Sequence, residues 1–350
     1  MLFCVTGLYA QSNKELAKQK GQEAVELMDN GQITESITLL KEAMQLDPES
    51  NVYPYEIALA HYYLKEYKKA IDILEKLAKR KDVSKNTFQL LGNSYDMEGN
   101  PSKAIATYEK GLKKFPNAGN LYLEMGVMQI AKEDYDKALS FFEKGIEADP
   151  AYPSNYYWTS KIFIGSSEKL WGMIYGELFM NLERNSKRTQ EISKLLFDTY
   201  KSQIQFTSDT SISVSFSKIS TISLSELADP KNLRLPYGLI VYEPTLLLSI
   251  PLEKKIDISA LDRIRTRFVQ TYFKNDHHKK YPNVLFSFQK QLLEIGHLEA
   301  YNHWILMQGD EQGFTEWEQA NKDKWNSFVE WFTKNPLQIE DSNKFIRATY

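Results

Sequence analysis

The chain has 350 residues, of which 25% are charged, and its formal net charge is −3. This near balance excludes a global electrostatic attraction to nucleic acid or to an anionic membrane. The length accommodates two domains, or one extended array with a cap, and 21 Tyr, 18 Phe and 6 Trp favour a well-filled core over bulk disorder.

The first ten residues predict an export signal. Residues 1–9 are uncharged and mostly apolar, and the small residue Ala10 precedes a polar run, which is typical of the end of a secretory signal peptide cleaved after Ala10. We therefore expect residues 1–10 to be a signal-peptide remnant and the protein to reach the periplasm or cell envelope of a Gram-negative bacterium. The alternative is a cytoplasmic protein with an apolar N-terminus. No other stretch is long and apolar enough to span a membrane, and the single cysteine, Cys4, leaves no second thiol for a disulfide.

Residues 86–150 contain two near copies of one sequence, offset by 34 positions. The matching pairs are Gly92 and Gly126, Ala104 and Ala138, Tyr108 and Phe142, Gly111 and Gly145, and Pro116 and Pro150. Such a period is typical of a helix-turn-helix unit that cannot bury its apolar face alone and therefore stacks on copies of itself.

This pattern resembles the tetratricopeptide repeat (TPR) family over residues of about 12–184. Continuing the period in both directions predicts four clear repeats, a degenerate fifth repeat over 150–184 and an amphipathic capping helix over 189–204. The four repeats span Ser12–Asp47, Pro48–Lys81, Asp82–Phe115 and Pro116–Asp149. The fold class is therefore mainly α: a TPR-type solenoid over 12–204, followed by a mostly helical region over 205–350.

Small residues recur at two positions of every repeat, where they let the paired helices approach closely. In the first helices they are Ala24, Ala58, Gly92 and Gly126, and in the second helices Ser36, Ala70, Ala104 and Ala138. Larger apolar residues, such as Leu74 and Phe142, fill the space beside them.

The region after residue 204 resembles no family that we can name. Strict alternation near 204–224 predicts a short β-hairpin with its turn at 208–210, residues 227–236 predict a loop, and 237–251 favour a helix. Three helices then follow: one over 260–274 capped by Ser259, one from Pro282 to about Met307, and one bearing an aromatic stripe. That stripe, at Phe314, Trp317, Asn321, Trp325, Phe328 and Phe332, predicts core packing rather than a cofactor site.

The sequence offers no motif for a catalytic, cofactor-binding or metal site. The nucleotide-binding, metalloprotease and serine-hydrolase motifs are absent. His297 and His303 are six positions apart and would diverge around a helix, while the pair His277 and His278 predicts a solvated basic loop. The arginines at 263, 265 and 267 are spread around a helix, which is typical of a solvated face.

In TPR arrays the first helices of successive repeats line a concave face, and this resemblance implies a partner-binding groove. The predicted lining is Tyr55, Leu59 and Tyr62, then Gln89, Asn93 and Asp96, then Leu123, Val127 and Ile130, then Tyr157, Lys161 and Ile164. Each triplet has the spacing of one helical face. Tyrosines offer rigid area with a polar tip, and the amides could bond an extended backbone. Chaperone-tail-binding members of the family bind a terminal carboxylate with Lys, Arg and Asn. Only Asn93 and Lys161 match these positions here, and we therefore do not expect the chain to share that specificity.

We therefore expect a non-catalytic module that binds a peptide or protein segment on the concave face, without nucleic acid or cofactor. One alternative is that the C-terminal half fills the groove as core. A second is that this half is an enzymatic or small-ligand domain positioned by the array. A third, which the aromatics prompt, is a glycan-binding envelope protein. The sequence does not specify the partner or the oligomeric state.

Overall fold

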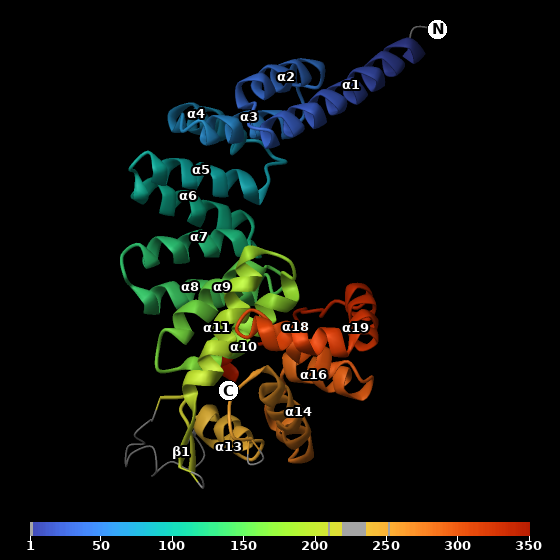
Figure 1. Cartoon of the computed structure of the whole chain (residues 1–350). Helices are drawn as coiled ribbons and strands as arrows, with labels where there is room; N and C mark the ends of the chain where they lie inside the picture. The colour runs from blue at the N-terminus through green and yellow to red at the C-terminus, as the bar shows by residue number, and fades with distance from the viewer. Residues whose placement is uncertain (1–2, 209–210, 219–235, 251–252) are drawn as a thin grey trace. The chain divides into compact units, whose positions relative to one another are not determined.

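The structure, a computed structural model, describes residues 3–208, 211–218, 236–250 and 253–350 (Figure 1). It is mainly helical, with one two-stranded antiparallel sheet, and this confirms the predicted fold class. The chain divides into two compact units, Met1–Lys132 and Glu133–Tyr350. The boundary lies between the two helices of the fourth repeat, and residue 204 lies inside the second unit.

The first unit consists of three helix pairs and the first helix of the fourth repeat. Its helices are α1 (Phe3–Asp29), α2 (Ile33–Leu46), α3 (Val52–Tyr63), α4 (Tyr67–Leu77), α5 (Lys85–Met97), α6 (Pro101–Lys114) and α7 (Gly119–Ile130). The helices of the pairs α1–α2, α3–α4 and α5–α6 pack against each other, and α1 contacts α3, α3 contacts α5, and α5 contacts α7. The first helices of this unit therefore contact one another in succession, as expected for the inner side of a repeat array.

The small residues have the predicted role in this packing. A Cβ atom added to Gly92 would lie 2.1 Å from the ring of Tyr108, and one added to Gly111 would lie 2.6 Å from Leu121. Ala58, Ala70 and Ala104 are fully buried. Larger side chains at these positions would push the helices apart.

The second unit opens with the end of the array. It begins with α8 (Tyr135–Ala148), α9 (Pro153–Ile164), α10 (Lys169–Leu182) and α11 (Lys187–Gln203). The pair α9 and α10 confirms the degenerate fifth repeat, and α11 confirms the capping helix. Every residue of α10 from Leu170 to Asn181 is buried. Because a terminal helix of a solenoid would leave one face in water, this burial shows that later segments of the chain cover α10.

The predicted hairpin is present as β1 (Ile204–Ser208) and β2 (Ser211–Val214), paired antiparallel with Ile204 opposite Val214. The predicted turn residues 209 and 210, and most of the predicted loop over 227–236, lie outside the described residues. The segment predicted to be a helix over 237–251 is helical in its described part: a π-helical turn η1 (Gly238–Tyr242) continues into α13 (Glu243–Leu247).

The remaining helices correct several predictions. They are α14 (Ile258–Lys274), α15 (His277–Lys280), α16 (Val284–Glu294), α17 (Leu298–Leu306), α18 (Glu311–Ala320), α19 (Lys322–Lys334) and the short 3-10 helix η2 (Arg347–Thr349). Asp257, not Ser259, caps α14, because its side chain accepts from the backbone N–H of Ala260. The predicted helix from Pro282 to Met307 is two helices, since Gly296 adopts φ +79° between them. The helix of the aromatic stripe is likewise divided, between α18 and α19 at Asn321.

The core of the second unit surrounds α10. Aromatic residues of the stripe pack in it as predicted, with Phe328 and Phe332 stacked at 4.9 Å between ring centroids. Phe345, near the C-terminus, is also buried there, with its ring centroid 5.2 Å from that of Tyr175. None of the helices in the described ranges combines the length and apolarity needed to cross a bilayer.

Candidate interaction surface

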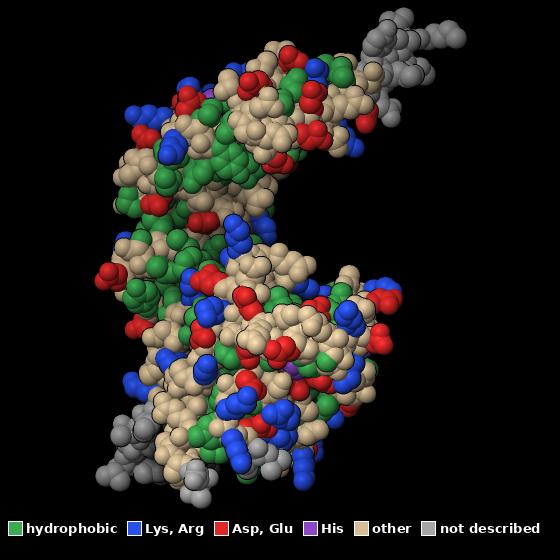
Figure 2. Space-filling model, viewed as in Figure 1, with side chains coloured by type: hydrophobic (Ala, Val, Ile, Leu, Met, Phe, Trp, Pro, Cys, Tyr) green, Lys and Arg blue, Asp and Glu red, His purple; other side chains and the backbone are tan. Residues whose placement is uncertain are grey.

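The predicted lining residues of the first unit lie on three neighbouring first helices. Those of α3, α5 and α7 are half-buried, except Asp96, which is exposed. Figure 2 shows hydrophobic side chains exposed over α3 to α7 in this view. We call this surface the inner face, and it comprises Tyr55, Leu59, Tyr62, Gln89, Asn93, Asp96, Leu123, Glu124, Val127 and Ile130.

A carboxylate that the sequence analysis did not single out, Glu124, is held at this face by amides. The Gln89 Nε2 donates to Glu124 Oε1 at 2.6 Å, and Asn120 Nδ2 donates to Gln89 Oε1 at 2.7 Å. The Asn93 side chain bonds Glu124 as well, and Asn93 Oδ1 accepts from the Tyr108 hydroxyl at 2.6 Å. The two amides predicted to bind a ligand backbone are thus engaged within the repeats, where they fix the position of Glu124.

The hydrogen bonds to Glu124 only partly offset the cost of burying its charge. Burial raises its pKa above the ordinary value, the bonds from Gln89 and Asn93 lower it, and the charge of Asp96 raises it again. The pKa of Tyr62 is also raised. Burial is the main cause, and the nearby ionisable groups of Tyr67, Glu124 and Asp96 add to it. Groups from α3, α5 and α7 therefore converge on one acidic, tyrosine-bearing region of the inner face.

A groove of about 600 Å³ lies between α1 and α3 of the same unit. Val25 and Val52, which are 38% and 59% exposed, contribute apolar surface to it. Its one half-buried carboxylate is Glu56, whose pKa burial raises. This groove extends the apolar surface of the unit toward its N-terminal helix.

The last predicted triplet lies on α9, in the second unit, and is covered by the capping helix. Tyr157 is 7% exposed, and its hydroxyl donates to Glu191 at 2.6 Å. Lys161 Nζ donates to the same carboxylate at 2.7 Å, and the Arg188 guanidinium lies 5.1 Å from the Tyr157 ring centre. Tyr157 and Lys161 are thus occupied by residues of α11, while Ile164 is half-buried.

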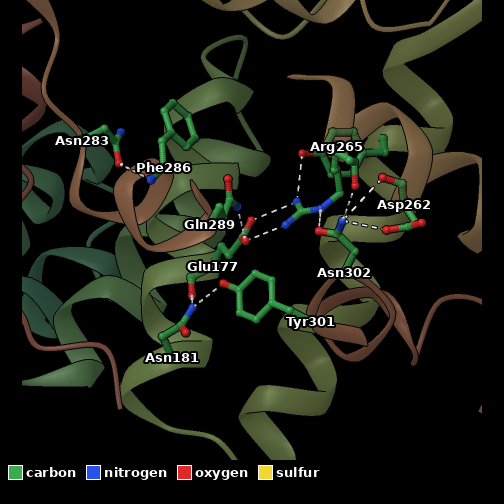
Figure 3. Close-up of polar contacts among 11 residues, drawn as sticks. Glu177, Asn181, Asp262, Arg265, Asn283, Phe286, Gln289, Tyr301 and Asn302 are labelled. Atoms are coloured by element: carbon green, nitrogen blue, oxygen red, sulfur yellow. Dashed lines mark hydrogen bonds and ion pairs between the residues drawn. The ribbon is translucent and has the colours of Figure 1, made fainter. Parts of the chain in front are cut away.

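A polar network in the second unit bears on the alternative of a catalytic C-terminal half. Arg265 donates to both oxygens of Glu177, at 2.6 and 2.9 Å, and to Asn302 at 2.8 Å (Figure 3). Gln289 adds a bond to Glu177 at 2.6 Å. The adjoining cavity measures about 20 Å³, space for about one water molecule. This network joins α10, α14, α16 and α17.

The network also corrects the interpretation of the arginines. Arg265 is 5% exposed rather than solvated, because its partner Glu177 is on α10, far away in sequence. Arg263 and Arg267 both bind Glu253, at 2.7 and 2.6 Å. The sequence predicts how these three arginines are spread around the helix, but not which carboxylates they bind.

The histidines and tryptophans of the second unit are involved in packing. His303 stacks on Trp317 at 4.0 Å, and His277 and His278 lie in the short helix α15 against Tyr272 and Phe273 instead of a solvated loop. Across the described ranges, no three His, Cys, Asp or Glu side chains are placed to hold a metal ion. All six tryptophans are buried or half-buried against the core, so their rings do not support the glycan alternative.

The stacked helix pairs define a helical-repeat protein. Two segments, residues 55–80 and 90–153, match family models of the tetratricopeptide repeat. The repeat region of this chain belongs to the tetratricopeptide repeat family.

Individual relatives match weakly. Human cilia- and flagella-associated protein 70 is 26% identical over 102 residues, which are 28% of this chain and 9% of that protein. The chain thus spans less than a tenth of this relative. Among solved structures, the TPR protein TTC0263 of Thermus thermophilus is 14% identical with a TM-score of 0.43, over 51% of this chain and 98% of that one. The pilF protein of Pseudomonas aeruginosa is 15% identical with a TM-score of 0.44, over 54% and 86%.

Proposed function

We propose that this protein is a non-catalytic scaffold that binds a protein segment on the inner face of its first unit. One observation carries the proposal: half-buried side chains on α3, α5 and α7 form a contiguous surface of apolar, aromatic and polar groups. Membership of a family of helical repeats that present such surfaces supports it.

The chemistry of the inner face suits a peptide or helix. Tyr55 and Tyr62 combine apolar rings with hydroxyl groups, and such residues contribute strongly to protein interfaces. Leu123, Val127 and Ile130 add a row of aliphatic side chains on α7. Protein interfaces usually combine an apolar core with a polar rim, and the inner face offers both kinds of group.

Replacing Tyr62 by Ala tests the proposal. We expect recovery of the bound partner by the full chain to fall about tenfold or more, as for an interface residue with a large contact. The matched control is Tyr135→Ala, which removes a tyrosine that is 50% exposed on α8 and lies outside the inner face. Equal recovery by both variants, at unchanged melting temperatures, would contradict the proposal.

We also propose that the protein is exported, on the basis of the apolar residues before Ala10. Mass spectrometry of the protein from its native cells should then find a chain that begins at Gln11 in the periplasmic or envelope fraction. A cytoplasmic chain that retains the first ten residues would contradict this.

A further inference from the structure

We propose that the inner face of the first unit binds a segment carrying a lysine or arginine side chain, and that Glu124 and Asp96 hold this cation beside the ring of Tyr62. The proposal rests on the proposed function and specifies the chemistry of its partner. The balance of hydrogen-bond donors and acceptors on this face supports it.

The inner face has an excess of acceptors over available donors. Glu124 receives bonds from the Gln89 and Asn93 amides, but a carboxylate has about four acceptor positions. Among the described residues, no lysine or arginine forms a salt bridge with Glu124 or with the exposed Asp96. The carboxylates are therefore able to accept bonds from an incoming ammonium or guanidinium group.

A second, separate acceptor lies in the same hydrogen-bonded chain. Asn120 is 3% exposed, and its Nδ2 donates to Gln89 Oε1 at 2.7 Å. Its Oδ1 atom is buried and has no donor among the residues that the structure describes. A buried acceptor without a partner destabilises a protein, so the chain of amides that holds Glu124 carries one more acceptor than it has donors.

The surrounding groups suit a cation in particular. A half-buried carboxylate attracts a positive charge more strongly than an exposed one because water screens it less. Aromatic rings attract a cation to their faces, and the half-buried Tyr62 ring lies beside that of Tyr67, edge to face at 5.4 Å. By contrast, a segment that ends in a carboxylate or bears acidic side chains would be repelled by Glu124 and Asp96.

Binding of two labelled peptides to the full chain tests the proposal. One peptide alternates Lys and Ala, and the other has Glu in place of every Lys. We expect only the lysine peptide to bind, with an affinity that falls at high salt, and we expect Glu124→Gln to weaken binding by about tenfold or more. Asp96→Asn, at an exposed site that is not needed for folding, should weaken it as well. The matched control is Glu109→Gln, on the exposed side of α6, which should bind like the unaltered chain.

The outcomes separate this proposal from the one on which it rests. Equal binding of the lysine peptide by the control and by both acidic-site variants would overturn the cation proposal, as would binding of the glutamate peptide. If, in those cases, the Tyr62→Ala variant still recovers less of the natural partner than the unaltered chain, the inner face remains the binding surface for a segment of different charge. If Tyr62→Ala has no effect on either ligand, both proposals fail.

Discussion

Replacing Arg265 by Met is expected to destabilise the second unit strongly. The change leaves Glu177, which is 4% exposed, without its bidentate, charged partner, and the side-chain bonds that remain, from Gln289 and Tyr301, come from neutral groups. Removing one partner of a buried ion pair typically costs about 3–5 kcal/mol because the other charge stays buried and unpaired. At about 2–4 °C per kcal/mol for a unit of this size, the melting temperature should fall by roughly 10 °C.

The double variant Arg265→Met with Glu177→Met distinguishes this explanation from a simple loss of packing. Because neither charge of the Arg265–Glu177 pair remains, we expect the free energy of unfolding of the double variant to be at least about 2 kcal/mol higher than that of the single variant. Asn302 still loses a donor in both variants, so recovery should be incomplete. Urea unfolding followed by tryptophan fluorescence suits the measurement, since the tryptophans lie in the second unit. A single variant as stable as the unaltered chain, or a double variant no more stable than the single one, would refute the reasoning.

Three further predictions concern individual positions. Gly92→Ala should destabilise the first unit by about 1–3 kcal/mol in thermal unfolding, because the new methyl group would lie 2.1 Å from the Tyr108 ring; an unchanged midpoint would contradict the assigned packing. Gly296→Ala should cost about 1–2 kcal/mol, since φ there is +79°, whereas Gly296→Asn should cost less; equal costs would count against a conformational cause. Glu124→Gln should be more stable than the unaltered chain at pH 7. The pKa of Glu124 is raised in the folded chain, so folding favours the protonated carboxyl group. The contribution of this group to stability is fully present below its ordinary pKa of 4.5 and is lost as the pH rises through the raised pKa. That advantage should vanish near pH 4 in paired melting curves, and an advantage independent of pH would exclude ionisation as the cause.

The repeat architecture was predictable because its signals are local and recur. Small residues such as Ala70 and Ala104 return every 34 positions, and each one reports a close helix–helix approach within a single repeat. The period therefore fixed the helix pairs, and the lining positions on α3, α5 and α7 followed from helical spacing. The hairpin was predictable from its alternation for the same reason.

The parts that the sequence did not predict depend on distant partners or on backbone conformation. Arg265 is buried because Glu177 lies opposite it, 88 residues away, and no local pattern indicates such a pair. The break at Gly296 was missed because glycine within a helical pattern is often tolerated. Glu124 was missed because it lies one position beyond Leu123, and only the bonds from Gln89 and Asn93 show that it belongs to the inner face.

Site-specific photocrosslinking in native cells tests the central claim most directly. A photoreactive residue is placed at position 62 or 127 on the inner face, and at position 135 as a control outside it. We predict that positions 62 and 127 crosslink to the same basic segment of one partner and that position 135 does not. Crosslinks to that partner from position 135 alone would contradict a binding role for the inner face.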